Sequence, residues 1–280
     1  MYLIADSGST KTQWCMVENG ACEVIYTSGI NPVYLSDKEI LRLLEQEFKV
    51  REKKVEAVYF YGAGCAFPEK NEQVRRALKD FFAASQVEIA SDLLAAARSL
   101  FQHEPGVACI LGTGSNSCCY DGEGIVANIP PLGFILGDEG SGAAMGKRLV
   151  ADLLKGILPG KLRECFFEEY RCSYPEIIDR VYRQPLPNRY LASFALFLKK
   201  YIAIPEIENI VSAALEEFIC RSLLPYQEIR HLPVSFTGSV AFHFQEQLIR
   251  LLKKYGLSPG RICRTPMEGL ITFHNASSLQ

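Results

Sequence analysis

The chain has 280 residues, of which 48% are hydrophobic and 22% charged, and its formal net charge is −2. This is an ordinary globular composition, long enough for one large or two modest domains. The near-neutral charge argues against a nucleic-acid-binding surface, and no apolar run approaches the roughly 20 residues that span a bilayer. The N-terminus lacks a basic region followed by an apolar stretch, so we expect no signal peptide and a cytoplasmic protein.

The first stretch is an apolar run that ends in a carboxylate and continues into a turn of small residues. Residues 1–5 predict a strand, Asp6 ends it, and Gly8, Ser9, Thr10 and Lys11 form the turn before strand-like residues resume. Backbone N–H groups in such a turn can approach a phosphate closely, and a neighbouring carboxylate can hold Mg²⁺. Taken alone, an ordinary hairpin explains the pattern equally well.

Asn31 follows the third expected strand and precedes Pro32. The proline favours extended geometry at Asn31, which places this residue in a connecting loop. Its amide can donate and accept hydrogen bonds, as a sugar hydroxyl requires. An Asn-Pro pair is also a common turn initiator, and the sequence alone favours neither interpretation.

Strands and helices then alternate, which favours an α/β domain. Residues 87–90 predict a fifth strand, and Asp92 lies where this strand passes into a helix over residues 93–101. Asp is a favoured helix N-cap. However, the carboxyl ends of strands in α/β sheets are also where ligands bind.

The opening pattern occurs a second time in the middle of the chain. Residues 107–111 predict a buried strand, Gly112, Thr113, Gly114 and Ser115 form the turn, and residues 116–120 resume the strand before another hairpin. Two such turns facing each other would clamp a polyphosphate. The repetition therefore favours a nucleotide site in a cleft between two lobes.

The stretch from 130 to 142 is the most unusual part of the second half. Four glycines predict a bent loop that carries Asp138 and Glu139, and its apolar flanks favour a loop folded against the cleft. Residues 161–230 are expected to be mostly helical. Gly238 and Ser239 then follow a strand over 233–237 and lead into a helix expected from 242 to 255, an arrangement that suits a flat ligand such as adenine.

The ten cysteines show no spacing typical of zinc or iron–sulfur sites. Several lie inside apolar runs. We therefore expect reduced, buried thiols that pack as small hydrophobic groups.

Four motifs in this order resemble those of the actin/hexokinase/Hsp70 ATPase superfamily. They are Asp6–Thr12, Leu111–Asn116, Gly137–Gly142 and Thr237–Ala241. Within the superfamily the chain is similar to the BadF/BadG/BcrA/BcrD-type ATPases, the group that includes N-acetylglucosamine kinases. The resemblance implies an α/β fold of two actin-like ATPase (ribonuclease H-like) lobes around a central nucleotide cleft. The first lobe would be 1–106, completed by the C-terminal helix 266–280, and the second would be 107–265 with a helical insertion.

The resemblance also implies roles for individual residues. Asp92 would accept the proton of the sugar hydroxyl, and Asp6 would position Mg²⁺. The ATP-binding residues would be Gly8, Ser9, Thr10, Lys11, Gly112, Thr113, Gly114, Gly238 and Ser239. The sugar would contact Asn31, Asn116, Gly133 and Asp138.

The expected activity is transfer of the ATP γ-phosphate to an amino sugar, with N-acetylglucosamine at its 6-position as first choice. One departure affects the substrate, because Pro131-Leu132-Gly133 stands where the related kinases carry Gly-Trp-Gly. Glucosamine, N-acetylmuramic acid and other hexoses therefore stay open. The alternatives are an ATP-driven activator of a dehydratase or reductase, with an iron–sulfur cluster bridging a dimer, and a nucleotide-binding regulatory protein. The expected partner is a small sugar, with neither nucleic acid nor membrane, and a homodimer is left open.

Overall fold

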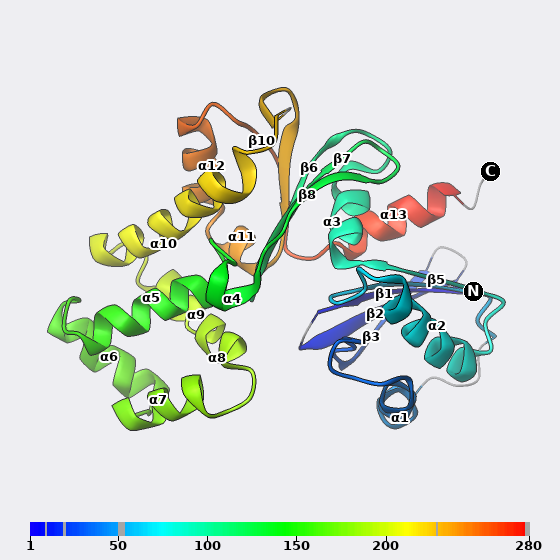
Figure 1. Ribbon diagram of the computed structural model, residues 1–280, viewed down its shortest axis with the longest axis horizontal. Helices are drawn as coiled ribbons and strands as arrows, with labels where there is room; N and C mark the ends of the chain where they lie inside the picture. The colour runs from blue at the N-terminus through cyan, green and yellow to red at the C-terminus, as the bar shows by residue number, and fades with distance from the viewer. Residues whose placement is uncertain (9, 19–20, 50–53, 228, 278–280) are drawn as a thin grey trace. The chain divides into compact units, whose positions relative to one another are not determined.

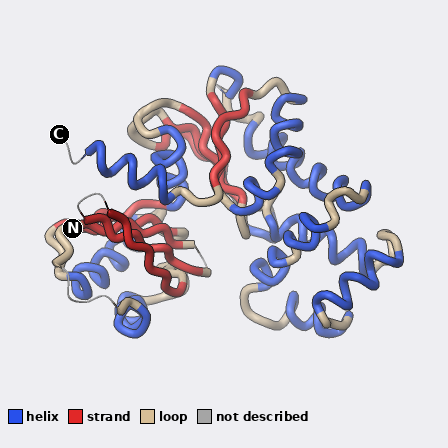
Figure 2. Tube along the Cα trace, turned by 180° about the vertical axis from the view of Figure 1, so that it is seen from behind, coloured by secondary structure: helices blue, strands red, loops and turns tan. Residues whose placement is uncertain are grey.

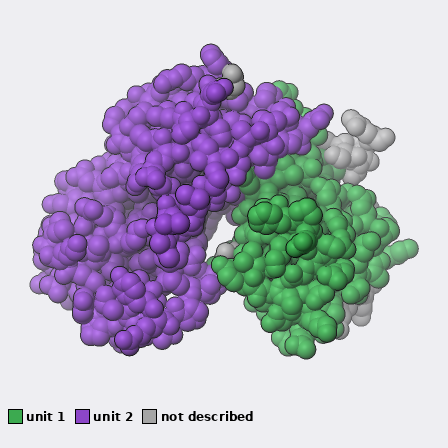
Figure 3. Space-filling model, viewed as in Figure 1, with its two compact units in different colours: residues 1–104, 266–280 green, residues 105–265 purple. Residues whose placement is uncertain are grey.

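The computed structural model describes residues 1–8, 10–18, 21–49, 54–227 and 229–277. The chain divides into two compact units (Figure 3). Unit 1 comprises Met1–Glu104 and Pro266–Gln280, and unit 2 comprises Pro105–Thr265. From the sequence we expected this division two residues later, between 106 and 107. Within the described residues, no helix is both long and apolar enough to cross a membrane.

Unit 1 is built on a five-stranded mixed sheet with the order β3-β2-β1-β4-β5. The first three strands are consecutive antiparallel neighbours, as the two predicted hairpins require, whereas β4 and β5 continue the sheet in parallel from β1. The strands are β1 (Tyr2–Ser7), β2 (Lys11–Glu18), β3 (Ala21–Ser28), β4 (Ala57–Gly62) and β5 (Gln86–Ser91).

Helices cover both faces of this sheet, and alternation along the strands supplies each face with apolar side chains. Leu3 and Trp14 pack with α1 (Asp37–Glu47) and α2 (Pro68–Phe82) on one face. Ile4 and Cys15, the neighbours of Leu3 and Trp14 in sequence, pack on the other face with α3 (Asp92–Phe101) and α13 (Met267–Ser277). Figure 1 shows the two helix pairs on opposite sides of the strands. The last helix of the chain thus completes the unit that the first strand begins.

The expectation of reduced thiols is wrong for one pair of cysteines. Cys15 on β2 and Cys22 on β3 form a disulfide, with 6.0 Å between their Cα atoms. The register pairs Cys15 with Val24 and Cys22 with Val17, so the two cysteines are diagonal neighbours on one face of the hairpin. Diagonal cross-strand neighbours lie within reach of each other, which a spacing of seven residues does not reveal in the sequence.

Unit 2 repeats the topology of unit 1 strand for strand. Its sheet has the order β10-β9-β6-β7-β8, with antiparallel hairpins on one side of β6 and parallel strands on the other. The strands are β6 (Gly106–Leu111), β7 (Ser115–Tyr120), β8 (Ile125–Ile129), β9 (Pro233–Thr237) and β10 (Ser258–Cys263). Two mixed sheets of the same topology confirm the predicted duplicated α/β fold. The sequence predicted a hairpin turn after β7 but gave no bounds for β8, the strand that follows it, because most residues of β8 are exposed and show no alternation.

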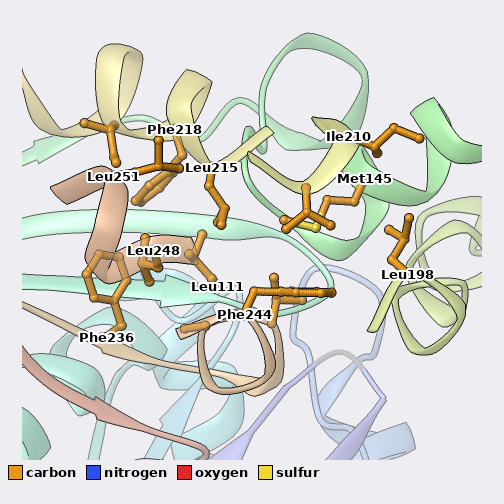
Figure 4. Packing of buried hydrophobic residues seen from close by; sticks show 14 of the residues in the cluster. Leu111, Met145, Leu198, Ile210, Leu215, Phe218, Phe236, Phe244, Leu248 and Leu251 are labelled. Atoms are coloured by element: carbon orange, nitrogen blue, oxygen red, sulfur yellow. The ribbon is translucent and has the colours of Figure 1, made fainter. Parts of the chain in front are cut away.

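The helices of unit 2 enclose one large apolar core around the strand residues Leu111 and Phe236 (Figure 4). They are α4 (Gly133–Leu136), α5 (Gly142–Leu154), α6 (Gly160–Tyr170), α7 (Tyr174–Tyr182), α8 (Pro187–Ser193), α9 (Ala195–Lys200), α10 (Pro205–Phe218), α11 (Ser239–His243) and α12 (Gln245–Lys254). Figure 2 shows strands and helices of each unit as separate layers. The single helix expected from 242 to 255 is wrong, because Phe244 leaves helical geometry at φ −113° and separates α11 from α12.

A wider turn follows α10 directly. Ile219–Leu223 form a π-helix, in which the Leu224 N–H donates to the Ile219 carbonyl oxygen at 2.9 Å. Such i→i+5 turns are rare and are often found at functional sites.

Candidate functional site

The turn between β1 and β2 is closed by its own backbone. The Gly8 N–H donates to the Lys11 carbonyl oxygen at 3.1 Å, and the Gly29 N–H donates to the Thr10 carbonyl oxygen at 3.1 Å. Gly8, Thr10 and Lys11 are exposed. Ser9, the remaining residue predicted for this turn, lies outside the described residues. The turn therefore presents backbone and side-chain groups of small residues at the carboxyl end of β1.

Two buried hydroxyls that sequence reasoning missed fix this turn to the loop that carries Asn31. The Ser7 and Thr12 hydroxyls lie 2.7 Å apart, and both side chains are fully buried. The Ile30 N–H donates to the Ser7 hydroxyl oxygen at 2.9 Å, and the Ser7 hydroxyl donates to the Ile30 carbonyl oxygen at 2.9 Å. Their signal in the sequence is a polar residue at each end of the turn, at positions where the strand pattern calls for an inward side chain.

Asn31 itself is buried, and its side-chain oxygen takes part in the turn that the residue initiates. Its Oδ1 accepts a hydrogen bond from the Val33 N–H at 2.9 Å. A Cβ built on Gly64 would lie 2.3 Å from the same oxygen, so only glycine at 64 admits this side chain. The turn interpretation is therefore confirmed. The amide N–H groups are what Asn31 can still offer as donors to a ligand.

Asp6 and Asp92 lie at one edge of the sheet of unit 1. Asp6 near the end of β1 pairs with Tyr61 of β4, and Gly62 pairs with Ser91 at the end of β5. Burial first, and then the charge of the Asp92 carboxylate, raise the pKa of Asp6 to about 7, although the Lys11 ammonium opposes the shift. Burial also raises the pKa of Asp92. Two carboxyl groups with raised pKa at a sheet edge are typical of a functional site.

The interpretation of Asp92 as an N-cap is wrong. Ser91 is the N-cap of α3, and its hydroxyl oxygen accepts from the Leu94 N–H at 3.2 Å. Asp92 is the first helical residue, and its Oδ1 accepts from the Leu93 N–H at 2.9 Å. The N-cap position is therefore filled by Ser91, and Asp92 lies in the first turn of α3.

The second small-residue turn, between β6 and β7, is backed by the start of α5. The Gly112 N–H donates to the Gly114 carbonyl oxygen at 2.9 Å within the turn. From behind, the Gly142 N–H donates to the Gly112 carbonyl oxygen at 2.8 Å and the Ala143 N–H donates to the Thr113 carbonyl oxygen at 3.1 Å. These bonds occupy carbonyl oxygens of the turn and fix the direction of its peptide units.

The loop from 130 to 142 folds against this turn, although it contains the short helix α4 where an irregular bend was expected. Asp138 is 8% exposed, and its Oδ1 accepts from the Ser115 N–H at 3.4 Å. A Cβ on Gly114 would lie 3.0 Å from Asp138 Oδ2. Burial raises the pKa of Asp138. Gly133, by contrast, is exposed at the start of α4, and the Gly137 N–H donates to its carbonyl oxygen at 2.8 Å.

Asn116 on β7 is oriented by a neighbour that sequence reasoning missed. Asn116 Oδ1 accepts from the Ser117 N–H at 2.9 Å and from Asn128 Nδ2 at 3.0 Å. The backbone N–H can only donate, so this contact fixes which end of the amide is the oxygen. Asn116 therefore has its amide N–H groups as donors for a ligand. No local pattern signals Asn128, because it lies on β8, whose bounds were not predicted.

Gly238 allows the start of α11 to pack against β6, the strand that leads into the turn between β6 and β7. It adopts φ +117°, and a Cβ there would lie 2.2 Å from the Leu111 carbonyl oxygen. The Gly238 N–H donates to the Cys263 carbonyl oxygen at 3.1 Å. Because β6 and β9 are parallel, Gly238 and Ser239 follow β9 at the same edge at which Gly112 follows β6.

The structure thus groups the predicted residues within each unit. Unit 1 holds Asp6, Gly8, Thr10, Lys11, Asn31 and Asp92 at the carboxyl edge of its sheet or in adjoining loops. Unit 2 gathers Gly112, Thr113, Gly114, Gly238 and Ser239 at the equivalent edge, with Asp138 against the turn. Asn116 lies on β7 beyond that turn, and Gly133 lies in the Asp138 loop.

An iron–sulfur cluster bridging a dimer would draw on Cys118 and Cys119 or on Cys165 and Cys172, and the first two are buried on β7. Cys118 is fully buried and Cys119 is 8% exposed. Burial raises the pKa of Cys118 to about 12, which disfavours the thiolate that binds metal. Across the described parts of the chain, no three His, Cys, Asp or Glu side chains are grouped so that they could hold a metal ion.

Comparison with known proteins gives the family. No family model and no curated protein matches the chain. Among solved structures, the putative N-acetylglucosamine kinase of Porphyromonas gingivalis is 45% identical over 99% of both chains, with a TM-score of 0.95. A putative N-acetylglucosamine kinase of Chromobacterium violaceum shares the fold at 19% identity and a TM-score of 0.68, covering 98% of this chain and 99% of that one. A ROK family glucokinase of Streptomyces griseus, in complex with glucose and AMPPNP, also shares the fold, at 14% identity and a TM-score of 0.59, covering 98% of each chain. The chain therefore belongs to the N-acetylglucosamine kinase-like family of sugar kinases, with the two-lobed actin-like ATPase fold.

Proposed function

We propose that this carbohydrate kinase transfers the γ-phosphate of ATP to the 6-hydroxyl of N-acetylglucosamine. The observation that carries the proposal is the pair of carboxyl groups, Asp6 and Asp92, at one edge of the sheet in unit 1, neither of which is needed as a helix cap. The sugar named for the Porphyromonas gingivalis relative supports the choice of acceptor. We assign the chain to the BadF/BadG/BcrA/BcrD-type branch, as its four motifs suggest.

In this proposal the phosphates of ATP lie against the two small-residue turns. Gly8, Ser9, Thr10 and Lys11 serve one unit and Gly112, Thr113 and Gly114 the other, with Gly238 and Ser239 at the adenosine. Their backbone N–H groups are suited to anions because they are strong fixed donors. The bonds from Gly142 and Ala143 keep the second turn in one conformation, so little reorganisation is needed when ATP binds.

Asp6 fits a role as the residue that holds Mg²⁺. Its carboxylate is disfavoured by burial and by Asp92, and the Lys11 ammonium relieves it only in part. A divalent cation would favour the ionised form, as a magnesium-binding carboxylate requires. When bound, Mg²⁺ would neutralise charge on the transferring phosphoryl group.

Asp92 serves as the general base in this mechanism. Its carboxylate accepts the proton of the attacking sugar hydroxyl, and the oxygen then bonds to the γ-phosphorus as ADP leaves. The raised pKa brings Asp92 closer to the operating pH, which improves a general base. Asn31 and Asn116 offer N–H donors to the sugar, and Asp138 offers a carboxylate.

Leu132, which replaces the family tryptophan, adopts φ +62° and is 62% exposed. It offers an aliphatic surface in place of an aromatic one for the N-acetyl group to pack against. A site that lacks this ring still accepts N-acetylglucosamine in our account, through Asn31, Asn116 and Asp138.

A release assay for ADP tests the proposal. The panel is N-acetylglucosamine, N-acetylmannosamine, glucosamine, N-acetylmuramic acid and glucose, each with ATP and Mg²⁺. We expect release that depends on sugar and is fastest with N-acetylglucosamine. Preference for another sugar would overturn the acceptor assignment, and release that no sugar stimulates would overturn the kinase mechanism.

A further inference from the structure

The loop that carries Asp138 is held in an unusual backbone conformation. Leu132, Gly133, Asp138 and Gly140 all have φ between +57° and +75° within nine residues. Positive φ is strained for a residue with a side chain, and such strain persists only where the surroundings enforce it. The position of the Asp138 carboxylate therefore depends on contacts that hold the loop from outside.

Backbone bonds provide part of this support. The Asp138 N–H donates to the Pro131 carbonyl oxygen at 2.9 Å, and the Ser141 N–H donates to the Asp138 carbonyl oxygen at 3.2 Å. A Cβ on Gly137 would lie 2.1 Å from the same Pro131 oxygen, so the loop is narrow as well as bent. These bonds fix the shape of the loop, but each lies within the loop itself.

The end of α10 and the π-helix after it supply a support from outside the loop. A Cβ on Gly140 would lie 2.8 Å from Phe218 Cβ, so the loop packs directly on the last residue of α10. Three residues further on, Arg221 Nε of the π-helix lies 2.8 Å from Glu139 Oε1. Phe218 and Arg221 thus contact the residues at 139 and 140, immediately after Asp138.

The ion pair between Arg221 and Glu139 differs from an ordinary surface pair. The Arg221 side chain is 60% exposed, but the Glu139 side chain is only 13% exposed. Removal of the arginine would leave a nearly buried carboxylate without its cation, which costs far more than loss of an exposed pair. The Glu139 carboxylate also acts on Asp138, since it raises the pKa of its neighbour. Arg221 is therefore placed to control both the position and the electrostatic surroundings of Asp138.

We propose that Arg221 is a positioning residue for sugar binding, which acts through Glu139 to hold the Asp138 loop against the turn between β6 and β7. The proposal rests on the proposed function, because it assigns Asp138 to the sugar. Arg221 lines a groove of about 730 Å³ together with Glu139, Lys147 and Arg148. It need not touch the substrate to exert this effect.

The test compares Arg221→Gln with the unaltered enzyme at a temperature well below unfolding. We expect the KM for the sugar to rise about tenfold, a typical coupling for residues in contact, with a parallel rise in the sugar Kd by calorimetry. The KM for ATP should change less than threefold, because Gly142 and Ala143 hold the phosphate turn through their own backbone bonds. Arg221→Lys keeps the positive charge and should recover most of the sugar affinity.

Arg148→Gln is the matched control. Arg148 lines the same groove and is similarly exposed, but its ion pair is with Asp152 of its own helix, at 2.7 Å. It should leave both KM values unchanged. A Glu139→Gln background should abolish the effect of Arg221→Gln, because the ion pair with the loop is then gone and the other ion pair of Arg221, with Glu217 at 3.7 Å, lies outside the loop.

Three results would overturn the inference while leaving the kinase assignment intact. They are an unchanged sugar KM in Arg221→Gln, equal rises in the KM for sugar and ATP, and the same fold-change in the Glu139→Gln background. A protein that shows no sugar-dependent turnover in its unaltered form would instead contradict the proposed function. The two failures are thereby distinguished.

Discussion

Asp6 near the end of β1 and Asp92 directly after β5 lie at the same edge of one sheet, and the charge of Asp92 raises the pKa of Asp6. The parallel pairing of β1, β4 and β5 produces this arrangement, since parallel strands present their carboxyl ends together. Two carboxylates at one sheet edge repel each other, which favours binding of a cation between them. The surroundings of Asp6 and Asp92 differ, and this difference suits them to different roles, metal binding for Asp6 and proton acceptance for Asp92. Asp6 is flanked by Lys11, whereas Asp92 begins a helix.

Asp92→Asn should abolish sugar phosphorylation while it preserves the fold. Loss of a general base costs about 10²–10⁴-fold in rate, and the amide can still accept the Leu93 N–H through its oxygen. Steady-state kinetics should show a collapse of kcat with a Kd for ATP within about threefold of the original. Asp80→Asn, an exposed position on α2, is the control and should leave turnover unchanged. Near-normal turnover in Asp92→Asn would show that Asp92 is not the general base.

Asp6→Asn should stabilise the ligand-free protein at alkaline pH. The pKa of Asp6 is raised to about 7 from the ordinary aspartate value of 3.8, so the folded state binds a proton more tightly than the unfolded state. Stability is therefore lost as pH rises from about 4 through 7, and replacement by a neutral amide removes this loss. Denaturant titrations should give the Asp6→Asn variant a higher free energy of unfolding than the unaltered protein at pH 8. The difference in unfolding free energy should shrink towards pH 4. An advantage that grows as the pH falls would contradict the shift.

The same substitution should impair the enzyme that it stabilises. Asp6→Asn removes the charge proposed to hold Mg²⁺, so thermal stabilisation by ATP with Mg²⁺ should fall, while stabilisation by ATP with EDTA should change little. Both can be read as shifts in Tm in one experiment. Equal stabilisation of both proteins by ATP with Mg²⁺ would argue that Asp6 does not act on the metal.

Gly238→Ala should destabilise unit 2 and weaken ATP binding. A Cβ at this position would lie 2.2 Å from the Leu111 carbonyl oxygen, and φ +117° is unfavourable for alanine. A strained backbone combined with a clash against main chain costs about 2–4 kcal/mol of unfolding free energy. Gly160→Ala, at the start of α6 with no atom within 4 Å of the added Cβ, should be neutral or slightly stabilising. Equal changes in the free energy of unfolding of Gly238→Ala and Gly160→Ala would contradict the prediction.

Asn128→Ala should raise the KM for the sugar through Asn116. Asn128 Nδ2 donates to Asn116 Oδ1 at 3.0 Å and to the Ser117 carbonyl oxygen at 2.7 Å. Loss of one such partner frees the Asn116 side chain to rotate, which we expect to cost about threefold to tenfold in sugar affinity. Initial rates over a range of sugar concentrations check this, and an unchanged sugar KM would show that Asn128 only supports the strand.

The strands on either side of the small-residue turn in each unit could be predicted because their signals are local. An apolar run, a carboxylate and a small-residue turn occupy neighbouring positions around Asp6, and the same run and turn recur around Gly112. The alternation of strands and helices after Asn31 likewise reflects adjacent residues. The family resemblance added the roles, which no local pattern contains.

Other parts of the site depend on contacts between residues far apart in sequence. Arg221 meets Glu139 across 82 positions, and the π-helix that presents it has no sequence pattern of its own. Gly64 accommodates Asn31 only because the folded chain brings the two together. Prediction of the Cys15–Cys22 disulfide requires knowledge of the strand register. The strand β8 is exposed at the edge of its sheet, so its residues show no pattern of buried and exposed positions. Tertiary packing decided each of these features.

The most direct measurement is identification of the product by ³¹P and ¹³C NMR after incubation of the protein with ATP, Mg²⁺ and N-acetylglucosamine. Our account predicts stoichiometric ADP and N-acetylglucosamine phosphorylated at carbon 6, with neither formed by Asp92→Asn. A phosphate on another carbon, or ATP consumed without any phosphorylated sugar, would contradict it.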